Sequence, residues 1–328
     1  MNPVGGVNLV TGATGLLGNN LVRLLLARGE TVRVLVRKPE DRSLAGLPVD
    51  CVPGDVRDLF SVQAACRGVS AVFHSAGYVR MGWRQPEIYQ SINVDGTRNV
   101  AVACRAVGAR MVHVSSTDVF GRCSLKHPAD EETQLRPGPD VPYAQTKRAA
   151  EFVVREEWSR GLNGVIVNPG FMLGPWDWKP SSGRMILAVA RGGALMAPNG
   201  WFSLCDARDV AAGALAARDC GVSARQYILA GETLRFIDGF RLIAEITHAR
   251  KPFMQARWFF ATLSGVSGDL WGLISGVEPD VNSAAVAMAR VPKNYSSARA
   301  EQELGYLRRP IRETVADAWT WFQEHGYH

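Results

Sequence analysis

Three glycines near the start of the chain restrict its fold more than any other feature. Gly12, Gly15 and Gly18 follow the apolar run Val7–Val10. They lie before or at the start of the segment Leu16–Arg28, whose apolar residues have helical spacing. The first glycine permits a sharp turn, the second lets backbone approach a pyrophosphate, and the third lets the helix pack closely on the strand. Free N–H groups at the helix start attract phosphate. The pattern therefore predicts a dinucleotide-binding turn made by Gly12, Thr14, Gly15, Leu16 and Leu17.

The first half of the chain alternates strand-like and helix-like segments, which is typical of an α/β protein with a parallel sheet. Right-handed crossovers would wind this sheet doubly, as in a Rossmann fold. The expected strands are 7–10, 31–36, 50–52, 71–75, 111–115, 164–167 and 226–229, and the expected helices are 16–28, 59–66, 86–107 and 143–160.

After about Pro169 the alternation breaks, and Pro, Gly and Trp become frequent. We expect residues 1–170 to form the nucleotide-binding Rossmann domain, with 203–230 returning to it. Residues 171–328 would mainly form a smaller, mostly helical substrate-binding lobe, with helices at 184–191, 209–218, 236–247 and 311–325.

Composition excludes several other classes of protein. The 328 residues carry a net charge of +6, but Lys and Arg are scattered, which argues against a nucleic-acid face. The six cysteines lie far apart without a Cys-x-x-Cys pair, so we expect no metal site and a reducing compartment. Without a basic and then apolar leader, a cytoplasmic location is expected.

One stretch, Trp258–Val277, is apolar apart from Asp269 and contains four glycines. We interpret it as a buried or pocket-lining helix pair. Contact with a membrane surface is the alternative, and Asp269 disfavours a true membrane span.

The end of the second strand indicates which dinucleotide binds. NAD-binding proteins usually place a carboxylate there, about 20 residues after the glycines, to hold the ribose. This chain instead has Arg37 and Lys38. A guanidinium can bind a 2′-phosphate that a carboxylate would repel, which predicts NADP(H), with NAD(H) as the alternative. After the third strand, Asp55 could accept a hydrogen bond from the adenine amino group, because Asp58 is the better N-cap for the next helix.

Tyr143 and Lys147 are four residues apart, so they project from one face of a helix. A cation close to a phenol lowers the phenol's pKa, so we expect Lys147 to make Tyr143 a useful acid and base. Ser116 follows a strand and would hold the substrate oxygen. Together these residues predict hydride transfer between a nicotinamide and a carbon–oxygen bond.

These motifs resemble the extended short-chain dehydrogenases/reductases over nearly the whole chain. The matching pieces are TGATGLLG (11–18), GDVRD (54–58), HSAG (74–77), INVDGTRNV (92–100), VSSTDVFG (114–121), YAQTK (143–147), NPGFMLGP (168–175) and ELGY (303–306).

The resemblance implies roles by position. Ser116, Tyr143 and Lys147 fall on the catalytic residues, with Lys147 also binding the ribose, and Asn93 falls on a supporting residue. The implied cofactor-binding positions further include Asp55, Val56, Ser75, Ala76, Gly77, Pro169, Gly170 and Met172.

Within the family, Arg37 is similar to the branch of dihydroflavonol reductases, 3β-hydroxysteroid dehydrogenases and hopanoid-associated reductases. Nucleotide-sugar epimerases usually carry an acidic residue there. The dehydratases want Asp-Glu after the Thr, and this chain has Thr117 and Asp118, which argues against dehydration.

Aromatic residues predict the substrate class, because large rings suit a bulky, apolar ligand. We expect an NADP(H)-dependent reductase or dehydrogenase acting on a bulky, mostly apolar ketone, aldehyde or alcohol. A sugar-nucleotide epimerase and a regulatory NADPH-sensing protein are the alternatives. A homodimer through helices 86–107 and 143–160 is expected, and a membrane partner is not. The expected substrate residues are Tyr78, Trp83, Phe171, Trp176 and Trp178.

Overall fold

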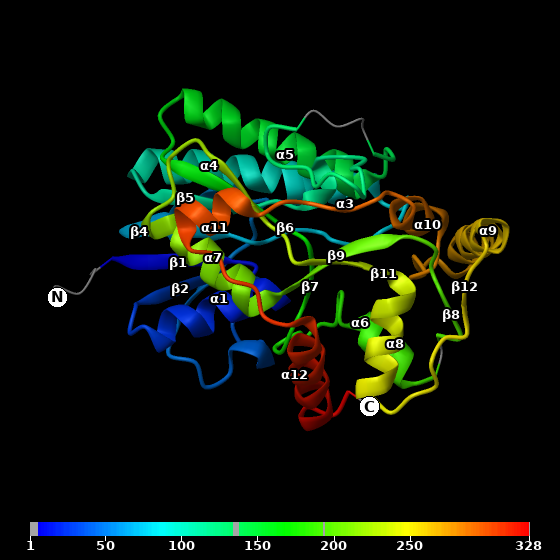
Figure 1. The fold of residues 1–328 in the computed structure, drawn as a ribbon. Coiled ribbons are helices and arrows are strands. Elements are labelled where there is room, and N and C mark those ends of the chain that lie inside the picture. The colour runs from blue at the N-terminus through cyan, green and yellow to red at the C-terminus, as the bar shows by residue number, and fades with distance from the viewer. Residues whose placement is uncertain (1–5, 134–137, 193, 328) are drawn as a thin grey trace.

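The central element of the computed structural model is a seven-stranded parallel sheet. The structure describes residues 6–133, 138–192 and 194–327. The strands lie in the order β10-β6-β5-β4-β1-β2-β3 (Figure 1). Their bounds are β1 (Val7–Thr11), β2 (Val32–Val36), β3 (Asp50–Pro53), β4 (Val69–His74), β5 (Arg110–Val114), β6 (Gly164–Pro169) and β10 (Gln226–Leu229).

Helices cover both faces of this sheet, which confirms the predicted doubly wound α/β fold (Figure 1). On one face α1 (Leu16–Ala27) packs beside α7 (Ala207–Asp219). On the other face lie α2 (Leu59–Cys66), α4 (Gly96–Val107) and α5 (Pro142–Ser159). The strands between them are buried on both sides, which explains their apolar runs.

The chain order reverses between β1 and β4. From β1 the chain winds outward to β2 and β3, and then crosses back to begin β4 on the other side of β1. In folds of this kind the loops at the carboxyl ends of the strands diverge at the reversal and leave a crevice for a ligand. The glycine turn after β1 opens into that crevice.

The expected helix 86–107 is interrupted. It consists of α3 (Pro86–Tyr89), a π-helical turn η2 (Gln90–Asp95) and α4. π-helical turns are rare and occur frequently at functional sites.

A second layer of the molecule contains more strand than the sequence predicted. A three-stranded sheet of order β11-β9-β7 is surrounded by helices that share one core with it. The bounds are β7 (Phe171–Leu173), β9 (Trp201–Asp206), β11 (Glu232–Arg235), α6 (Arg184–Ala190), α8 (Phe236–Ile246) and α12 (Ile311–Glu324). Smaller elements are the 3-10 turns η1 (Arg42–Leu44) and η3 (Thr117–Val119), β8 (Met196–Ala197), β12 (Met254–Gln255), α10 (Ser283–Ala289) and α11 (Ala298–Leu304).

The two sheets are not built from two consecutive parts of the chain. Strand β10 and helices α7 and α11 pack on the large sheet although they follow β7 in sequence. The domain boundary at residue 170 stays a prediction.

The prediction for 258–277 is wrong. The segment forms a single helix, α9 (Trp258–Ser275), in which only Gly265 and Gly272 are buried. Among the described residues, no helix has both the length and the apolar character needed to cross a bilayer.

Candidate active site

The glycine turn after β1 is shaped by close backbone contacts. Gly12 adopts a φ of +71°, and its carbonyl accepts a hydrogen bond of 3.0 Å from the Gly15 N–H. A Cβ on Gly12 would lie 2.6 Å from the Ala76 nitrogen, and one on Gly18 would lie 2.1 Å from the Gly12 oxygen. Larger residues are therefore excluded at both positions, as the sequence predicted for the turn and for the helix contact.

The same turn fits a pyrophosphate. A Cβ on Gly15 would meet only the Gly12 oxygen, at 3.4 Å, so its other side is open. Gly15 is also the N-cap of α1, whose first turn carries no acidic residue. The free N–H groups and the helix dipole favour an anion here.

The carboxyl end of β2 presents cations. Arg37 and Lys38 are both exposed there. The nearby carboxylate of Asp41 is taken by Lys179, whose Nζ lies 2.6 Å from it and 3.3 Å from Thr14 Oγ1. Lys179 comes from the loop before α6, and no motif in the sequence indicated it.

Asp55 already has a partner in its own loop, and its predicted bond to adenine stays a prediction. Its carboxylate accepts hydrogen bonds from the Arg57 backbone N–H and guanidinium at 2.8–3.0 Å. Arg57 holds the pKa of Asp55 below its ordinary value. Asp58 is the N-cap of α2, as predicted, and accepts from Phe60 and Ser61 N–H groups. Val56 lies between Asp55 and Asp58, and its carbonyl accepts a hydrogen bond from Asn99 Nδ2.

The segment after β4 is tied to β1. Ser75 Oγ donates to the Thr11 carbonyl at 2.7 Å, and the Ala76 N–H donates to Thr11 Oγ1 at 3.3 Å. Gly77 follows and is exposed. The predicted adenosine-side residues therefore lie beside the glycine turn.

A cavity of about 570 Å³ lies over the carboxyl ends of the strands. It brings together most of the predicted cofactor and catalytic residues. Those that line it are Gly12, Gly15, Leu16, Leu17, Ser75, Gly77, Ser116, Tyr143, Lys147, Gly170 and Met172. Pro169 is the last residue of β6 and precedes Gly170 at the cavity wall.

Tyr143 and Lys147 lie in the first turns of α5 and are nearly buried, with 8% and 6% of their surfaces exposed. Ser116 lines the same cavity, and its Oγ accepts a hydrogen bond from the Asp118 N–H at 3.1 Å. Burial and the charge of Asp118 raise the pKa of Tyr143, although Ser116 lowers it. The expected lowering by Lys147 is absent from this arrangement.

Lys147 is directed to the sheet. Its Nζ donates to the Val114 carbonyl at 2.7 Å. Burial lowers the pKa of Lys147 to about 8, against a smaller raising effect of Glu151. The ammonium is thus held at the end of β5, in the wall of the cavity that Tyr143 also lines.

The π-helical turn η2 positions one supporting residue. Asn93 Oδ1 accepts from the Tyr78 N–H at 2.7 Å, while Nδ2 donates to the Tyr78 carbonyl and to Thr146 Oγ1, both at 3.1 Å. Asn93 therefore links the segment after β4 to α5 beside Tyr143.

Four of the five expected substrate residues do not line the cavity. Trp176 and Trp178 pack with Trp321 of α12 at centroid distances of 5.9 and 5.1 Å, because the loop after β7 folds onto that helix. Trp83 donates to Ser283 Oγ at 2.7 Å and does not line the cavity. Tyr78 also stands outside the lining and packs edge-on against Tyr89.

Phe171 does line the cavity, together with apolar residues that the sequence did not single out. These are Val79, Met185, Ala188, Phe240, Pro279 and Ala285. Polar residues were also missed: Lys293 lies 2.6 Å from Asp118, next to Ser116 and Tyr143. Chain positions so far apart give no local signal of their proximity.

Fold and site together define a Rossmann-type oxidoreductase with a serine, a tyrosine and a lysine at a dinucleotide cleft. The chain belongs to the NAD dependent epimerase/dehydratase family, which it matches over residues 8–230, and to the extended short-chain dehydrogenases/reductases.

Similar proteins include reductases. The chain is 36% identical over 326 residues to Sterol demethylase protein B of Methylococcus capsulatus, covering 97% of this chain and 98% of the relative. It is 35% identical to a putative dihydroflavonol 4-reductase of a Synechocystis species, covering 97% and 95%. The crystal structure of gox2253 superposes with a TM-score of 0.85 at 33% identity, covering 98% of this chain and 99% of that one.

Proposed function

We propose that the protein is an NADP(H)-dependent reductase or dehydrogenase that interconverts a carbonyl and an alcohol on a bulky, mostly apolar substrate. The observation that carries the proposal is the burial of Tyr143 with Ser116 and Lys147 in the wall of a cavity next to the glycine turn. The name of the similar putative dihydroflavonol 4-reductase supports the same reaction class.

In this proposal the glycine turn would hold the phosphates of the dinucleotide, and Lys147 would bind its ribose. Bound nicotinamide supplies or accepts the hydride. Ser116 Oγ orients the substrate oxygen, and Tyr143 Oη exchanges a proton with it. Because the pKa of Tyr143 is raised, its phenol is protonated at neutral pH and is ready to donate to a carbonyl oxygen.

The apolar residues of the cavity support a substrate with large apolar surface. Phe171, Met185 and Phe240 line the cavity from three different elements, β7, α6 and α8. A wall of this kind favours a ligand that buries apolar area and leaves one polar group for Ser116 and Tyr143.

Replacing Tyr143 tests the role of the phenol. Tyr143→Phe should lower turnover by about 10²–10⁴, because it removes the proton donor. Turnover is measured as NADPH oxidation with aromatic, steroidal and terpenoid ketones. The matched control is Tyr306→Phe, since the buried Tyr306 hydroxyl has no partner among the described residues. A Tyr143→Phe enzyme that keeps a tenth of the rate contradicts the proposal. Turnover of a nucleotide sugar without added cofactor would instead identify an epimerase.

Cofactor preference is tested at Arg37. We infer that Arg37 binds the 2′-phosphate, because it is exposed at the end of β2 where NAD-binding proteins place a carboxylate. Arg37→Asp should weaken NADPH binding by about tenfold or more and leave NADH binding little changed. Titration of each nucleotide by fluorescence measures both. A wild-type protein that binds NADH tenfold better than NADPH would overturn this assignment.

A further inference from the structure

The outer face of α9 is an unusually large exposed apolar surface. Its side chains leave 46–80% of their surface exposed. They are Trp258, Phe259, Phe260, Leu263, Val266, Leu270, Trp271, Leu273 and Ile274. Single exposed apolar residues are ordinary on proteins, but a continuous group of this size marks an interaction site.

An ordinary surface helix turns its large apolar side chains toward the protein, and α9 does the reverse. It packs on the protein through Gly265, Gly268 and Gly272, and a Cβ on Gly268 would lie 1.9 Å from the Val281 oxygen. Asp269, on the same side, accepts a hydrogen bond of 3.1 Å from the Ser283 N–H. The small and acidic residues therefore face the protein, and every large apolar side chain faces outward.

The apolar surface continues onto neighbouring elements. Strands β8 and β12 pair with each other, and exposed apolar residues flank or belong to both. Figure 1 shows these strands and α9 at the end of the molecule opposite β1 and β2. The added residues are Leu195, Met196, Phe253, Met254, Val277 and Val281. With the outer side of α9 they form what we call the α9 face.

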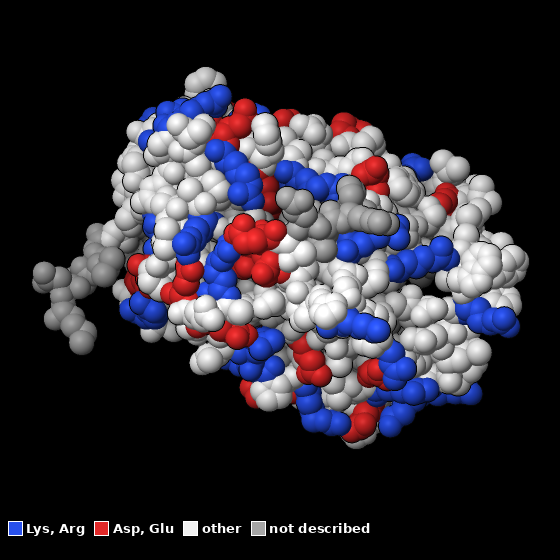
Figure 2. All heavy atoms as spheres, turned by 45° about the horizontal axis from the view of Figure 1, so that its top comes forward, with Lys and Arg blue, Asp and Glu red and all other residues white. Residues whose placement is uncertain are grey.

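Unpaired cations border the α9 face. Arg250, Arg257 and Arg290 are exposed, and none forms an ion pair with a carboxylate in the described part of the chain. Figure 2 shows Lys and Arg side chains around the largely uncharged surface at this end. The nearby Asp280 is paired with Arg184 at 2.6 Å, so its charge is compensated.

We propose that the α9 face docks on an anionic lipid bilayer. An interfacial helix lies in the membrane plane with its apolar side at the boundary of headgroups and acyl chains, and flanking Lys or Arg bind lipid phosphates. Tryptophans such as Trp258 and Trp271 favour that depth. A second copy is a poorer occupant, because a symmetric contact would bring the bordering arginines of both copies together.

The α9 face adjoins the active-site cavity. Residues Glu278, Pro279 and Asp280 lie two residues beyond the end of α9 and line the cavity wall. Docking would therefore place the cavity beside the bilayer, from which an apolar ketone could enter. This substrate route rests on the proposed function, whereas the docking itself does not.

Vesicle flotation with the full-length protein tests the docking. The protein should float with phosphatidylglycerol-containing vesicles and much less with pure phosphatidylcholine, and about 1 M salt should weaken the association. Ile274→Glu should reduce bound protein by about tenfold or more. The matched control is Leu307→Glu, because Leu307 is 81% exposed, like Ile274 at 80%, but lies between α11 and α12. It should float as the wild type does.

A second variant distinguishes a loss of membrane binding from a folding defect. Arg257→Glu leaves the apolar side chains intact and should weaken flotation with anionic vesicles only. Failure of the wild type to float with either vesicle overturns the proposal, as does equal loss in Leu307→Glu. A wild-type dimer that Ile274→Glu converts to a monomer in sedimentation velocity, without vesicle binding, would assign the face to a second copy. Flotation needs no turnover, so it fails independently of the proposed reaction.

Discussion

Burial acts in opposite directions on the two titratable side chains that α5 contributes to the cavity. It keeps the phenol of Tyr143 protonated, which suits a proton donor. It also destabilises the ammonium of Lys147, whose pKa falls from 10.5 to about 8. The protein therefore holds a cation where solvation is poor, an arrangement more typical of function than of stability.

Lys147→Met should make the protein more stable and inactive. Between pH 8 and 10.5 the unfolded chain binds more protons at Lys147 than the folded protein, so wild-type stability rises with pH there. At neutral pH the variant has no buried charge at this position. Its free energy of unfolding should therefore exceed that of the wild type by about 2 kcal/mol, after the lost hydrogen bond to Val114 is subtracted. The gain should disappear toward pH 10.5. Urea unfolding at several pH values measures it, and a variant less stable than wild type at pH 7 contradicts the interpretation.

At single residues the sequence predicted identities better than environments. The spacing of Tyr143 and Lys147 placed both on one helix face, and the structure brings Ser116 to them. The direction of the Tyr143 pKa could not be predicted, because it depends on burial and on Asp118. Likewise, no local pattern indicated that Trp178 packs against α12.

Among the elements, periodicity and turn residues predicted most of the large sheet. Helix α2 and strand β10 have the predicted bounds, because Asp58 caps the one and a short apolar run defines the other. Strand β9 was missed, since five of its six residues are buried and do not alternate. The orientation of α9 was missed because glycines, not large side chains, make its inner face.

One buried carboxylate fastens α5 to the strands at the edge of the sheet. Glu151 accepts from Asn168 Nδ2 at 2.7 Å and from Gln226 Nε2 at 3.1 Å, which joins α5, β6 and β10. It also raises the pKa of Lys147 one turn away. The helix that carries Tyr143 therefore depends on this contact for its position.

Glu151→Leu should lower the free energy of unfolding by about 2–4 kcal/mol, because it leaves two buried amide donors with fewer acceptors. It should also lower the pKa of Lys147 further. Chemical denaturation measures the first effect, and the pH dependence of NADPH binding measures the second. The control is Glu156→Leu. Glu156 lies on the same helix in a more exposed ion pair with Arg98, so its replacement should lower the free energy of unfolding by less than about 1 kcal/mol. Equal losses in the two variants would contradict the fastening role.

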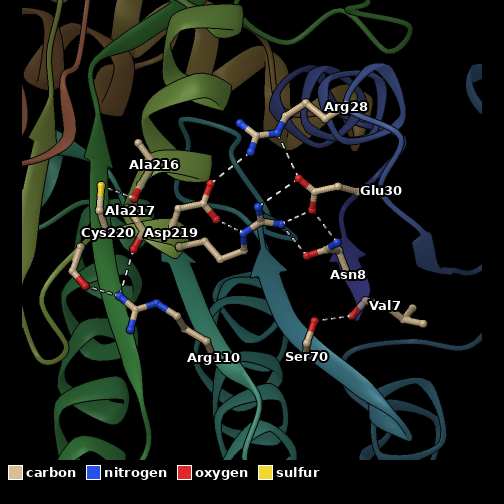
Figure 3. A network of polar contacts seen from close by, with 12 residues as sticks. Val7, Asn8, Arg28, Glu30, Ser70, Arg110, Ala216, Ala217, Asp219 and Cys220 are labelled. Carbon is tan, nitrogen blue, oxygen red and sulfur yellow. Dashed lines mark hydrogen bonds and ion pairs between the residues drawn. The ribbon is translucent and has the colours of Figure 1, made fainter. Parts of the chain in front are cut away.

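At the scale of the whole molecule, a polar network lies at the end of the large sheet opposite the cavity. The cavity lies at the carboxyl ends of the strands, whereas a polar network ties the amino ends together (Figure 3). In it the guanidinium of Arg218, from α7, contacts Asn8 of β1, Glu30 after α1, and Asp219. Arg218 and Glu30 are largely shielded from solvent, with 9% and 11% of their side chains exposed.

Arg218→Met should destabilise the protein by about 2–3 kcal/mol at neutral pH, since it leaves Glu30 without its main partner. Arg218 holds the pKa of Glu30 below its ordinary 4.5. The stabilisation is therefore present above that pH and is lost as the pH falls through the lowered value. The gap between wild type and variant should close in acid. Thermal unfolding from pH 7 to 3 checks this, with the exposed Arg312–Glu245 pair as a control. A gap independent of pH would assign the effect to packing instead.

The late position of β10 in the chain has a consequence for synthesis. Strand β6 is buried along its whole length in the finished protein, and one of its edges pairs only with Gln226–Leu229. A ribosome adding about 5–20 residues per second needs several seconds to deliver that partner after β6 has been made. During that interval the nascent chain carries an open, apolar strand edge, which is a template for aggregation. Translation pauses between these two segments should therefore increase the demand for chaperones more than pauses elsewhere.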